Sequence, residues 1–363
     1  MQKSARAAVF HGHVGQLTLE TLPIPELAPD QALVRVLACT ICGSDLHSLH
    51  GRRAVATPTI LGHEICGQLV ALGSKFPTND LNGQQLKPGD TLSWAIVANC
   101  DNCRHCLAGL PQKCEIGVKY GHMGWASGQI LSGGLAEYCV LAAGTKVIRL
   151  PSNLDLAVAC PASCATATIC AALEAAAKPA ATKRKIAILG LGMLGLTACA
   201  IAADQGYKEI VGVDPQPSRR ELAKSFAATK VLSPQEFTEI CASPATQQHD
   251  RFETVLELSG QSEMVAAGGA CLDIGGKLIL VGSVFPVPPV EFFPEQIVRK
   301  NLTIAGVHNY APRHLAQAID ILDRLQGKYP FASLVERWVS LAELPTLIQA
   351  GPHFAGIRLG VRP

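Results

Sequence analysis

One segment limits the fold of this chain more than any other: a glycine-rich turn that joins a predicted strand to a predicted helix. The strand covers residues 185–189, the pattern G-x-G-x-x-G covers 190–195, and the helix covers 196–205. A second strand follows at 209–214. Alternation of strand and helix is typical of a parallel sheet covered by helices. The sequence therefore predicts an α/β domain with a doubly wound parallel sheet around this turn.

The glycines of this turn have separate roles. Gly190 makes the tight turn, Gly192 lets the backbone approach a pyrophosphate, and Gly195 allows the helix to pack closely on the strand. Free N–H groups at the start of the helix then face the phosphates. We therefore predict that the turn binds a dinucleotide. The expected binding residues are Gly190, Gly192, Met193, Leu194 and Gly195.

Asp214 ends the second strand of this unit. A carboxylate at this position accepts hydrogen bonds from the ribose hydroxyls and repels a 2′-phosphate, so the expected cofactor is NAD rather than NADP. Arg219 and Arg220 follow closely, and an arginine nearby is the feature that accommodates a 2′-phosphate. A solvated helix start is the alternative for these two residues. We count Arg219 among the candidate cofactor-binding residues.

Four cysteines lie close together at Cys100, Cys103, Cys106 and Cys114. Four thiolates satisfy a closed tetrahedral zinc site and leave no position for water. Such a site orders a loop that has too few apolar residues to fold alone. A zinc ribbon that binds nucleic acid would need basic and aromatic residues, which the surroundings lack. An iron–sulfur cluster is a weaker alternative, and we predict a structural zinc lobe at about 98–115.

A second group of possible zinc ligands lies earlier in the chain. Cys42 opens the motif C-G-S-D-L-H at 42–47, and His63 lies in G-H-E at 62–64. A catalytic zinc uses three protein ligands and keeps one open position, so these two residues leave one ligand to be found. Spacing alone does not identify it. The alternative is that Cys42 and His63 are ordinary core residues, since free cysteine is often buried.

The two motifs resemble those of the zinc-dependent alcohol dehydrogenases of the medium-chain dehydrogenase/reductase superfamily. In that family the third ligand is often a cysteine in the context P-x-x-C-A, and residues 161–165 match it. The resemblance therefore implies Cys164 as the third ligand. It also implies a GroES-like β-rich catalytic domain at 1–164 and 304–363, and a Rossmann domain at 165–303.

The same resemblance assigns roles to residues around the metal. Ser44 matches the hydroxyl of a proton relay, and His47 matches the relay histidine that reaches solvent. Glu64 matches an acid behind the metal that can enter its coordination shell. Asp45 is expected to orient His63 by accepting a hydrogen bond from its ring. Loop capping is the alternative for Ser44, Asp45 and His47.

The implied reaction is hydride transfer between a small-molecule alcohol, or its aldehyde, and NAD, with one catalytic and one structural zinc per chain. Polyol and threonine dehydrogenases are alternatives, although they often use glutamate as the third ligand. A non-enzymatic member that keeps only the structural zinc is a further alternative. The family also implies a homodimer or homotetramer, and the apolar stretch 281–293 is the candidate surface.

Two arginines bear on the charge of the substrate. Arg52 and Arg53 lie between the predicted relay histidine and the second zinc ligand. The planar fork of arginine matches carboxylate or phosphonate oxygens, so an anionic alcohol is one prediction. Segments 51–53 and 306–310 resemble a subgroup proposed to act in phosphonate catabolism. Solvated arginines and a neutral alcohol form the alternative.

The composition argues against nucleic-acid and membrane-surface partners. The 363 residues carry a formal net charge of +2, whereas both kinds of partner require a concentrated basic field. Two uncharged runs, 156–173 and 186–203, reach the lower length limit of a membrane helix. Proline and polar residues interrupt the first run, and the turn glycines interrupt the second. Both are expected to be buried segments of a soluble protein.

The N-terminal residues 1–6 carry positive charge, but no apolar segment follows them. A secretory signal peptide needs such a segment, so we expect a cytoplasmic protein. The chain contains 14 cysteines. In a long chain without an export signal, these are expected to be metal ligands and buried thiols.

Overall fold

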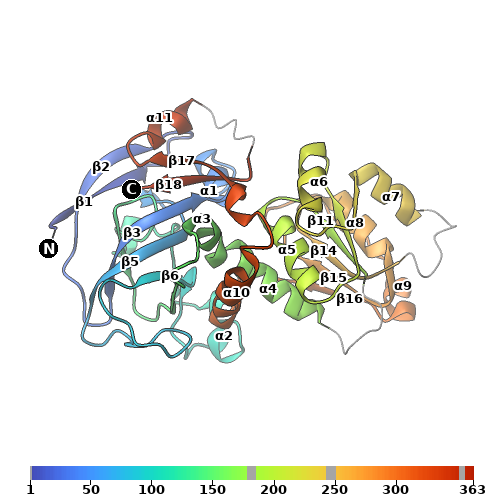
Figure 1. Cartoon of the computed structure of the whole chain (residues 1–363), viewed down its shortest axis with the longest axis horizontal. Coiled ribbons are helices and arrows are strands. Elements are labelled where there is room, and N and C mark those ends of the chain that lie inside the picture. Colours follow the sequence, from blue (N-terminus) through green and yellow to red (C-terminus); the bar gives the residue numbers. More distant parts are fainter. Residues whose placement is uncertain (1, 178–184, 243–250, 351–355) are drawn as a thin grey trace. The chain divides into compact units, whose positions relative to one another are not determined.

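The computed structural model describes residues 2–177, 185–242, 251–350 and 356–363 (Figure 1). The chain forms two compact units. The first comprises Met1–Ala167, Asn309–Gln326 and Phe331–Pro363, and the second comprises Thr168–His308 and Gly327–Pro330. The chain thus leaves the first unit after residue 167 and returns at residue 309, whereas the sequence analysis placed these divisions after residues 164 and 303.

The first unit is built mainly from antiparallel strands. Its largest sheet has the order β10-β6-β5-β3-β18-β17, and β9 also pairs with β3. The pair β17–β18 is parallel. Two smaller sheets have the orders β2-β1-β4 and β7-β8. The strands are β1 Ser4–Phe10, β2 Thr18–Pro23, β3 Ala32–Ile41, β4 Thr59–Ile60, β5 Glu64–Leu72, β6 Thr91–Trp94, β7 Val97–Ala98, β8 Val118–Lys119, β9 Tyr138–Leu141, β10 Val147–Arg149, β17 Val335–Ser340 and β18 Arg358–Arg362.

β3 holds the large sheet together, because it pairs with β5, β9 and β18. Its sequence, ALVRVLACTI, is almost entirely apolar, and only Arg35 is exposed. The β-rich character predicted for this part of the chain is therefore confirmed. The pairings of β3 also position the candidate site, since Cys42 directly follows β3 and Glu64 begins β5.

Short helices connect these strands. The longest, α10, begins with a proline at its first position, where no intrahelical N–H bond is lost. Leu315, Ile319, Leu322 and Leu325 are buried on one face of α10, as the apolar spacing predicted. The helical segments of this unit are α1 Gly43–Leu49, α2 Arg104–Leu107, η1 Pro111–Lys113, η2 Trp125–Ser127, α3 Leu156–Ala159, η3 Cys160–Ser163, α10 Pro312–Leu325, η5 Phe331–Leu334 and α11 Leu344–Gln349.

The second unit contains a six-stranded parallel sheet with the order β13-β12-β11-β14-β15-β16, and helices cover it (Figure 1). The strand order reverses beside β11, which confirms the predicted doubly wound fold. Residues 186–189 of β11 are fully buried, as expected for a parallel strand covered on both faces. The elements are α4 Ala165–Ala176, β11 Lys185–Leu189, α5 Met193–Asp204, β12 Glu209–Val213, α6 Pro217–Lys224, β13 Lys230–Leu232, α7 Pro234–Ala242, β14 Phe252–Glu257, α8 Ser262–Ala270, β15 Leu272–Leu280, α9 Pro294–Lys300 and β16 Thr303–Gly306.

The helix after the glycine-rich turn begins earlier than predicted. α5 starts at Met193 with Gly192 as its N-cap, so Gly195 lies inside the helix rather than in the turn. Glycine is needed at position 195 for a steric reason. Gly190 has φ 101°, and a Cβ atom on Gly195 would lie only 1.9 Å from the Gly190 carbonyl oxygen. Gly195 therefore lets the first turn of α5 pack against the end of β11.

Among the described residues, no single helix is long and apolar enough to cross a membrane. The segments Leu156–Ser163 and Ala165–Ala176 reach the required length only together, and they are bent relative to each other by 54°.

The cysteines outside the two predicted zinc sites are not all free thiols. Cys241 in α7 and Cys271 after α8 form a disulfide with Cα atoms 5.0 Å apart. The expectation of a buried thiol was therefore wrong for this pair, because packing of α7 against α8 brings together two positions that are distant in sequence. Within the described ranges, the other cysteines of this group are free and buried: Cys39, Cys66, Cys139, Cys160, Cys170 and Cys199.

Candidate active site

The three predicted ligands of the catalytic zinc converge in the first unit. Atoms of Cys42, His63, Cys164 and also Glu64 that could bind a metal lie within 4.8 Å of one another. Cys42 follows β3, His63 and Glu64 lie at the start of β5, and Cys164 lies between η3 and α4. Cys42, His63 and Glu64 are buried, and Cys164 is half-buried. The fold thus joins three segments that are far apart in sequence.

Asp45 fixes two of these segments. Its Oδ2 atom accepts a hydrogen bond from the Cys42 backbone at 2.9 Å, and its Oδ1 atom accepts one from the Gly62 backbone at 3.1 Å. Oδ1 also lies 3.2 Å from Nδ1 of His63. The proton therefore belongs on Nδ1, which leaves Nε2 free to bind a metal. Burial opposes protonation of His63, yet Asp45 and Cys42 together raise its pKa to about 10, so a metal that binds Nε2 would displace a second proton from the ring.

The segment that carries Cys164 is also held in place. The Ser163 hydroxyl donates to the His63 carbonyl oxygen at 3.2 Å, and the Tyr310 hydroxyl donates to the Ser163 carbonyl oxygen. The Tyr310 oxygen in turn accepts a hydrogen bond from the Ile96 backbone at 3.2 Å. A single buried network therefore links the third candidate ligand to the second.

Glu64 lies next to the candidate ligands and forms a bidentate ion pair with Arg358. The distances are 3.0 Å from Nε to Oε2 and 3.0 Å from an Nη atom to Oε1, and the same Nη atom lies 3.6 Å from Sγ of Cys42. The Thr40 hydroxyl also donates to Glu64 at 2.6 Å. Arg358 lies in β18 near the end of the chain. Sequence reasoning missed it, since no local motif marks it.

The donor set fits zinc. A hydrogen bond from Cys164 lowers the pKa of Cys42 well below its ordinary value, and Arg358 acts in the same direction. Cys42 is therefore the thiolate of this pair, and its hydrogen bond to Cys164 raises the pKa of that thiol. Two sulfur ligands and one imidazole suit zinc, and atoms that share one zinc lie at most about 4.6 Å apart. The candidate ligand atoms all lie within 4.8 Å of one another, so one ion can contact all three residues after small side-chain shifts.

The predicted relay residues lie together on α1. Ser44 Oγ is 3.4 Å from Nε2 of His63, next to the ligand atom. His47 follows one helical turn later, on the same face of α1. The backbone N–H groups of Arg52 and Arg53 donate to the His47 carbonyl at 2.9 and 3.2 Å and close the end of this helix. Arg52 is exposed, whereas Arg53 is half-buried.

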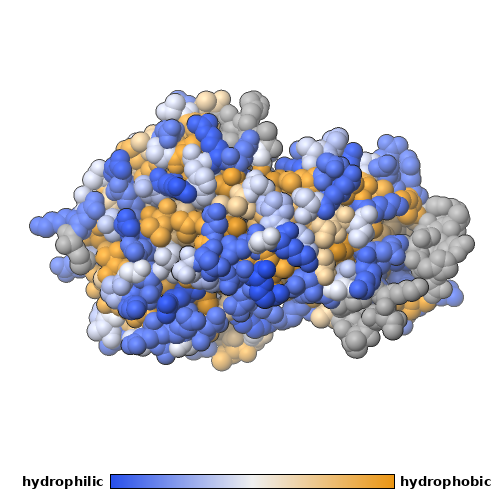
Figure 2. Space-filling view, viewed as in Figure 1, coloured by the Kyte–Doolittle hydropathy of each residue, from blue (hydrophilic) through white to orange (hydrophobic). Residues whose placement is uncertain are grey.

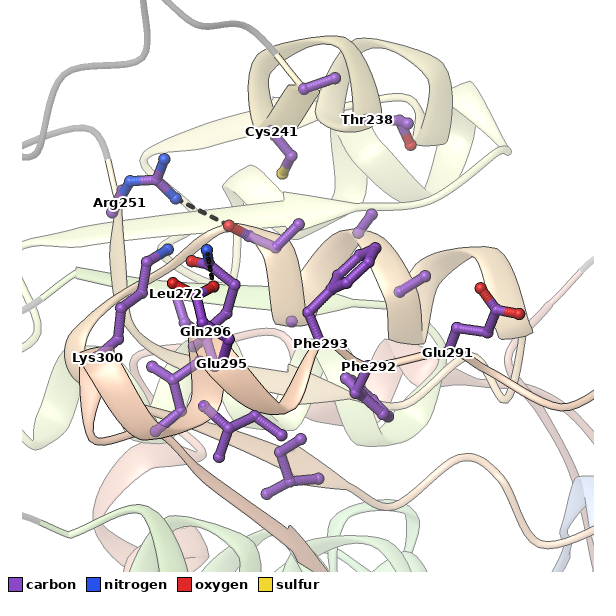
Figure 3. A pocket seen from close by; sticks show the side chains of 18 of the residues that line it. Thr238, Cys241, Arg251, Leu272, Glu291, Phe292, Phe293, Glu295, Gln296 and Lys300 are labelled. Atoms are coloured by element: carbon purple, nitrogen blue, oxygen red, sulfur yellow. Dashed lines mark hydrogen bonds between the residues drawn. The ribbon is translucent and has the colours of Figure 1, made fainter.

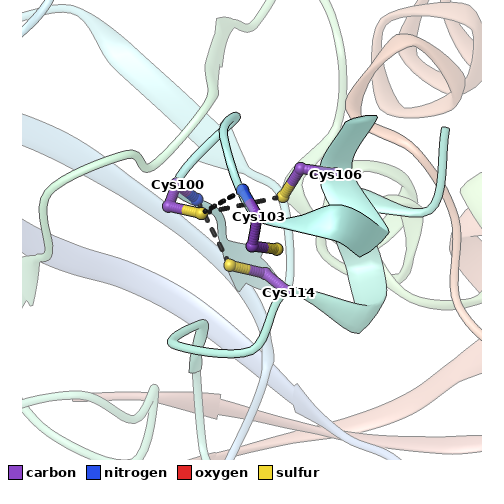
Figure 4. A group of neighbouring side chains, drawn as sticks. All are labelled: Cys100, Cys103, Cys106 and Cys114. Atoms are coloured by element: carbon purple, nitrogen blue, oxygen red, sulfur yellow. Dashed lines mark hydrogen bonds between the residues drawn. The ribbon is translucent and has the colours of Figure 1, made fainter. Parts of the chain in front are cut away.

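The four clustered cysteines meet in a separate lobe of the same unit (Figure 4). Their sulfur atoms lie within 4.8 Å of one another, and the backbones of Cys100 and Cys103 donate to the sulfurs of Cys114 and Cys100, each at 3.3 Å. The short helix α2 has no buried residue, and Leu107 is 76% exposed. Figure 2 shows apolar surface over α2 at the edge of the view. The lobe lacks a core of its own, as expected for a loop ordered by metal.

The dinucleotide turn lies in the second unit. A Cβ atom added to Gly192 would have no neighbour within 4 Å, so the backbone is open there to an approaching phosphate. Asp214 is buried, and its two oxygens accept hydrogen bonds from the backbones of Leu191 and Gln216, each at 2.9 Å. Arg219 lies 3.8 Å from Asp214, and its Nε atom is buried without a hydrogen-bond partner in the described structure.

A pocket of about 830 Å³ also lies in the second unit, lined by α7, α8 and α9 (Figure 3). Leu272 and Leu302 place it at the starts of β15 and β16. Because the strands are parallel, their starts lie at the edge of the sheet opposite to the strand ends that carry Gly190 and Asp214. This pocket is therefore separate from the predicted dinucleotide site.

Comparison with known proteins agrees with this arrangement. Residues 28–152 match the family of alcohol dehydrogenase GroES-like domains, and residues 194–324 match the family of zinc-binding dehydrogenases. A 5-exo-hydroxycamphor dehydrogenase from Pseudomonas putida is 30% identical over 96% of both chains. An L-threonine 3-dehydrogenase from Streptomyces avermitilis is 30% identical over 87% of this chain and 90% of its own length.

Solved structures support the same family. An alcohol dehydrogenase from Thermotoga maritima superposes with a TM-score of 0.89 at 28% identity, over 99% of each chain. A zinc-binding dehydrogenase from Sinorhizobium meliloti, bound to NADP, gives a TM-score of 0.84 at 26% identity and covers 100% of both chains. With its two matched domains, this chain belongs to the zinc-dependent alcohol dehydrogenase family of the medium-chain dehydrogenase/reductase superfamily.

Proposed function

We propose that this protein oxidises an alcohol, or reduces the corresponding carbonyl compound, with NAD as the hydride carrier and with one catalytic and one structural zinc per chain. Its relatives are oxidoreductases that act on CH–OH groups. The convergence of Cys42, His63 and Cys164 on one point carries the proposal. Three such ligands leave zinc an open position, which a catalytic site needs.

Zinc held by Cys42, His63 and Cys164 would act as a Lewis acid on the alcohol oxygen and lower its pKa. Ser44 lies beside Nε2 of His63 and would accept the released proton. His47, one turn further along α1, would pass it to solvent. Burial lowers the pKa of His47, with Arg52 adding to the effect, so the ring is neutral and able to accept a proton near pH 7.

Glu64 and Arg358 support the site without reaching the alcohol. Arg358 neutralises the Glu64 carboxylate and places a positive group near the Cys42 sulfur. A free carboxylate in this position would compete for the open coordination position that the alcohol needs. We therefore propose that Arg358 holds Glu64 back from the metal and favours the ionised form of Cys42.

NAD is the proposed cofactor because a buried carboxylate, Asp214, directly follows β12, where the adenosine ribose would bind. Arg219 is the opposing feature, since its unpartnered Nε atom is a donor that a 2′-phosphate could accept from. The two side chains lie 3.8 Å apart, so each partly neutralises the other.

We also propose assembly into a homodimer or homotetramer. Within the second unit, Val284 and Val287 of the apolar stretch 281–293 are 51% and 41% exposed, and Phe293 is 72% exposed. Large apolar side chains gathered on one surface mark an interaction site. Sedimentation at micromolar concentration tests the state, and a monomer would contradict this part of the proposal.

The direct test of function is an assay of reduced nicotinamide formed from a panel of alcohols, before and after treatment with a zinc chelator. We expect turnover with NAD that disappears when the more accessible metal is removed and returns when zinc is added. The proposal is wrong if no alcohol or carbonyl compound in a broad panel supports turnover by zinc-loaded protein.

A further inference from the structure

A group of basic side chains lies beside the candidate zinc ligands and has no part in holding them. The His122 ring lies 5.1 Å from the His63 ring, measured between centroids. An Nη atom of Arg53 is 2.7 Å from Nε2 of His122. Lys119, in β8, is three residues from His122 along the chain, and its ammonium group lies 3.3 Å from Oδ1 of Asn309. We call Arg53, Lys119, His122 and Asn309 the basic cluster.

His122 is neutral in this arrangement. Its Nδ1 atom lies 2.8 Å from the Tyr120 carbonyl oxygen, which only an N–H group can satisfy. Nε2 is therefore the acceptor of the hydrogen bond from Arg53. The ring thus serves to hold the Arg53 guanidinium in place next to His63.

The pairing of the two cations of the basic cluster is incomplete in the described structure. In the part of the chain that the structure describes, neither Arg53 nor Lys119 forms an ion pair with a carboxylate. Each has one side-chain partner, both of them neutral, although a guanidinium has five N–H donors and an ammonium has three. Half-buried cations with unused donors are costly unless an anion joins them.

The sum of the charges around the candidate zinc ligands also favours a bound anion. Zinc and two thiolates would cancel, and Glu64 cancels Arg358. Asp45 is then the remaining anion, and its oxygens are occupied by backbone N–H groups and by Nδ1 of His63, on the side of the ring away from the ligand atom. Lys119 and Arg53 therefore leave an excess of one positive charge within this group, and their unused donors face no competing carboxylate among the described residues.

We propose that the substrate is an alcohol that also carries an anionic group, a carboxylate or a phosphonate, and that Arg53 and Lys119 bind this group while the hydroxyl lies at the zinc. This inference rests on the proposed dehydrogenase function and narrows its substrate class. It also separates the two arginines of the sequence prediction. Arg53 belongs to the site, whereas Arg52 is exposed and contributes its backbone to the end of α1.

The test uses zinc-loaded protein and a matched set of alcohols: 1-butanol, 4-hydroxybutanoate and 3-hydroxypropylphosphonate. We expect kcat/KM to be higher for at least one anionic alcohol than for 1-butanol. Lys119→Gln and Arg53→Gln should each lower kcat/KM for that alcohol about 10- to 100-fold, the range for a lost charged hydrogen bond. The value for 1-butanol should change little. Arg52→Gln is the matched control: any effect through His47 would act on all three alcohols alike, so the ratio of kcat/KM for the anionic alcohol to that for 1-butanol should stay as in wild type.

Binding of unreactive anions gives a second readout that does not depend on turnover. Calorimetry with butanoate and with methylphosphonate should show which anion binds, and the binding should weaken in Lys119→Gln and recover in Lys119→Arg. Turnover of 1-butanol with no preference for either anionic alcohol would overturn this inference and leave the dehydrogenase function intact. Equal losses for charged and neutral alcohols in Lys119→Gln would also overturn it. Absence of turnover with every alcohol would instead contradict the function itself.

Discussion

The two cysteine-containing sites of the first unit use the same ligand chemistry in opposite surroundings. The catalytic cluster is buried, takes its ligands from three distant segments, and is surrounded by Asp45, Glu64 and Arg358. The lobe takes four ligands from one short segment, and all four are half-buried in a region without a core. From this comparison we propose that packing builds the first site before any metal arrives, whereas metal builds the second.

Removal of the third catalytic ligand should give the largest effect on activity. Cys164→Ala should lower kcat by at least about 1000-fold, because the Lewis acid that polarises the substrate oxygen is lost. The thermal unfolding midpoint should change little, since Ser163 and Tyr310 still hold the segment. Cys160→Ala, in the same segment but outside the ligand set, is the control and should stay active. Full activity of Cys164→Ala would refute the ligand assignment.

Replacing a cysteine of the four-cysteine lobe should reduce the stability of the fold rather than the rate of the reaction. Cys103→Ala should lower the free energy of unfolding by at least about 4 kcal/mol, the range seen when a structural metal is lost. Chemical denaturation measures this, and Leu107→Ala, at an exposed position of the lobe, should be neutral. A stable but inactive Cys103→Ala protein would show that the lobe takes part in catalysis.

The buried ion pair between Glu64 and Arg358 should contribute far more to stability than an exposed ion pair does. Arg358→Gln leaves the fully buried Glu64 carboxylate without its counter-charge and should cost about 3–5 kcal/mol of stability. The exposed pair of Arg6 and Glu137 is a matched control, for which Arg6→Gln should cost about 1 kcal/mol or less. Urea unfolding compares them. If adding Glu64→Gln to the Arg358→Gln variant restores none of the lost stability, the unpaired carboxylate is not the cause of the loss.

We expect residues of the second unit to determine the choice between NAD and NADP. Asp214→Ala should lower the ratio of kcat/KM for NAD to that for NADP by about 10- to 100-fold, because a charged hydrogen bond to the ribose is lost. Arg219→Ala should move the ratio in the opposite direction. A wild-type protein that prefers NADP would show that Arg219, rather than Asp214, decides the choice.

A smaller effect is expected from pH. Burial lowers the pKa of Lys119 to about 8, Arg53 and Lys113 act in the same direction, and Cys164 and Cys42 oppose it. Lys119 is therefore charged below about pH 8 and loses its proton above it. The KM for an anionic alcohol should rise several-fold as pH increases through 8, while the KM for a neutral alcohol should not follow. Parallel profiles for both alcohols would exclude Lys119 from substrate binding.

What the sequence could predict depended on how far apart the interacting residues lie along the chain. The four lobe cysteines and the glycine-rich turn are local, so their spacing was informative. The position of Cys164 required a family resemblance, because spacing cannot join residues 100 positions apart. Arg358 had no signal at all. It reaches Glu64 because β3 lies between β18 and β5. The antiparallel pairing of Leu359 with Ile41 brings Arg358 next to Cys42, and the pairing of Thr40 with Glu64 brings the start of β5 to the same place.

The basic cluster was missed for a similar reason. Arg53 was predicted, together with Arg52, to bind an anionic substrate, but its partner His122 and the neighbouring Lys119 lie on a segment that no sequence motif marks. A lone lysine or histidine in a loop is unremarkable in sequence. Only the folded unit shows that these side chains gather beside His63 without a carboxylate among them in the described structure.

Zinc content per chain, measured by mass spectrometry on wild type, Cys164→Ala and Cys103→Ala, tests the contrast between the two sites most directly. The wild type should contain two zinc ions, and each variant should retain one. The ion that remains in Cys164→Ala should resist a chelator, whereas the ion that remains in Cys103→Ala should be removed readily. A wild-type protein with one zinc, unaffected by Cys164→Ala, would contradict the account of a catalytic centre at Cys42, His63 and Cys164.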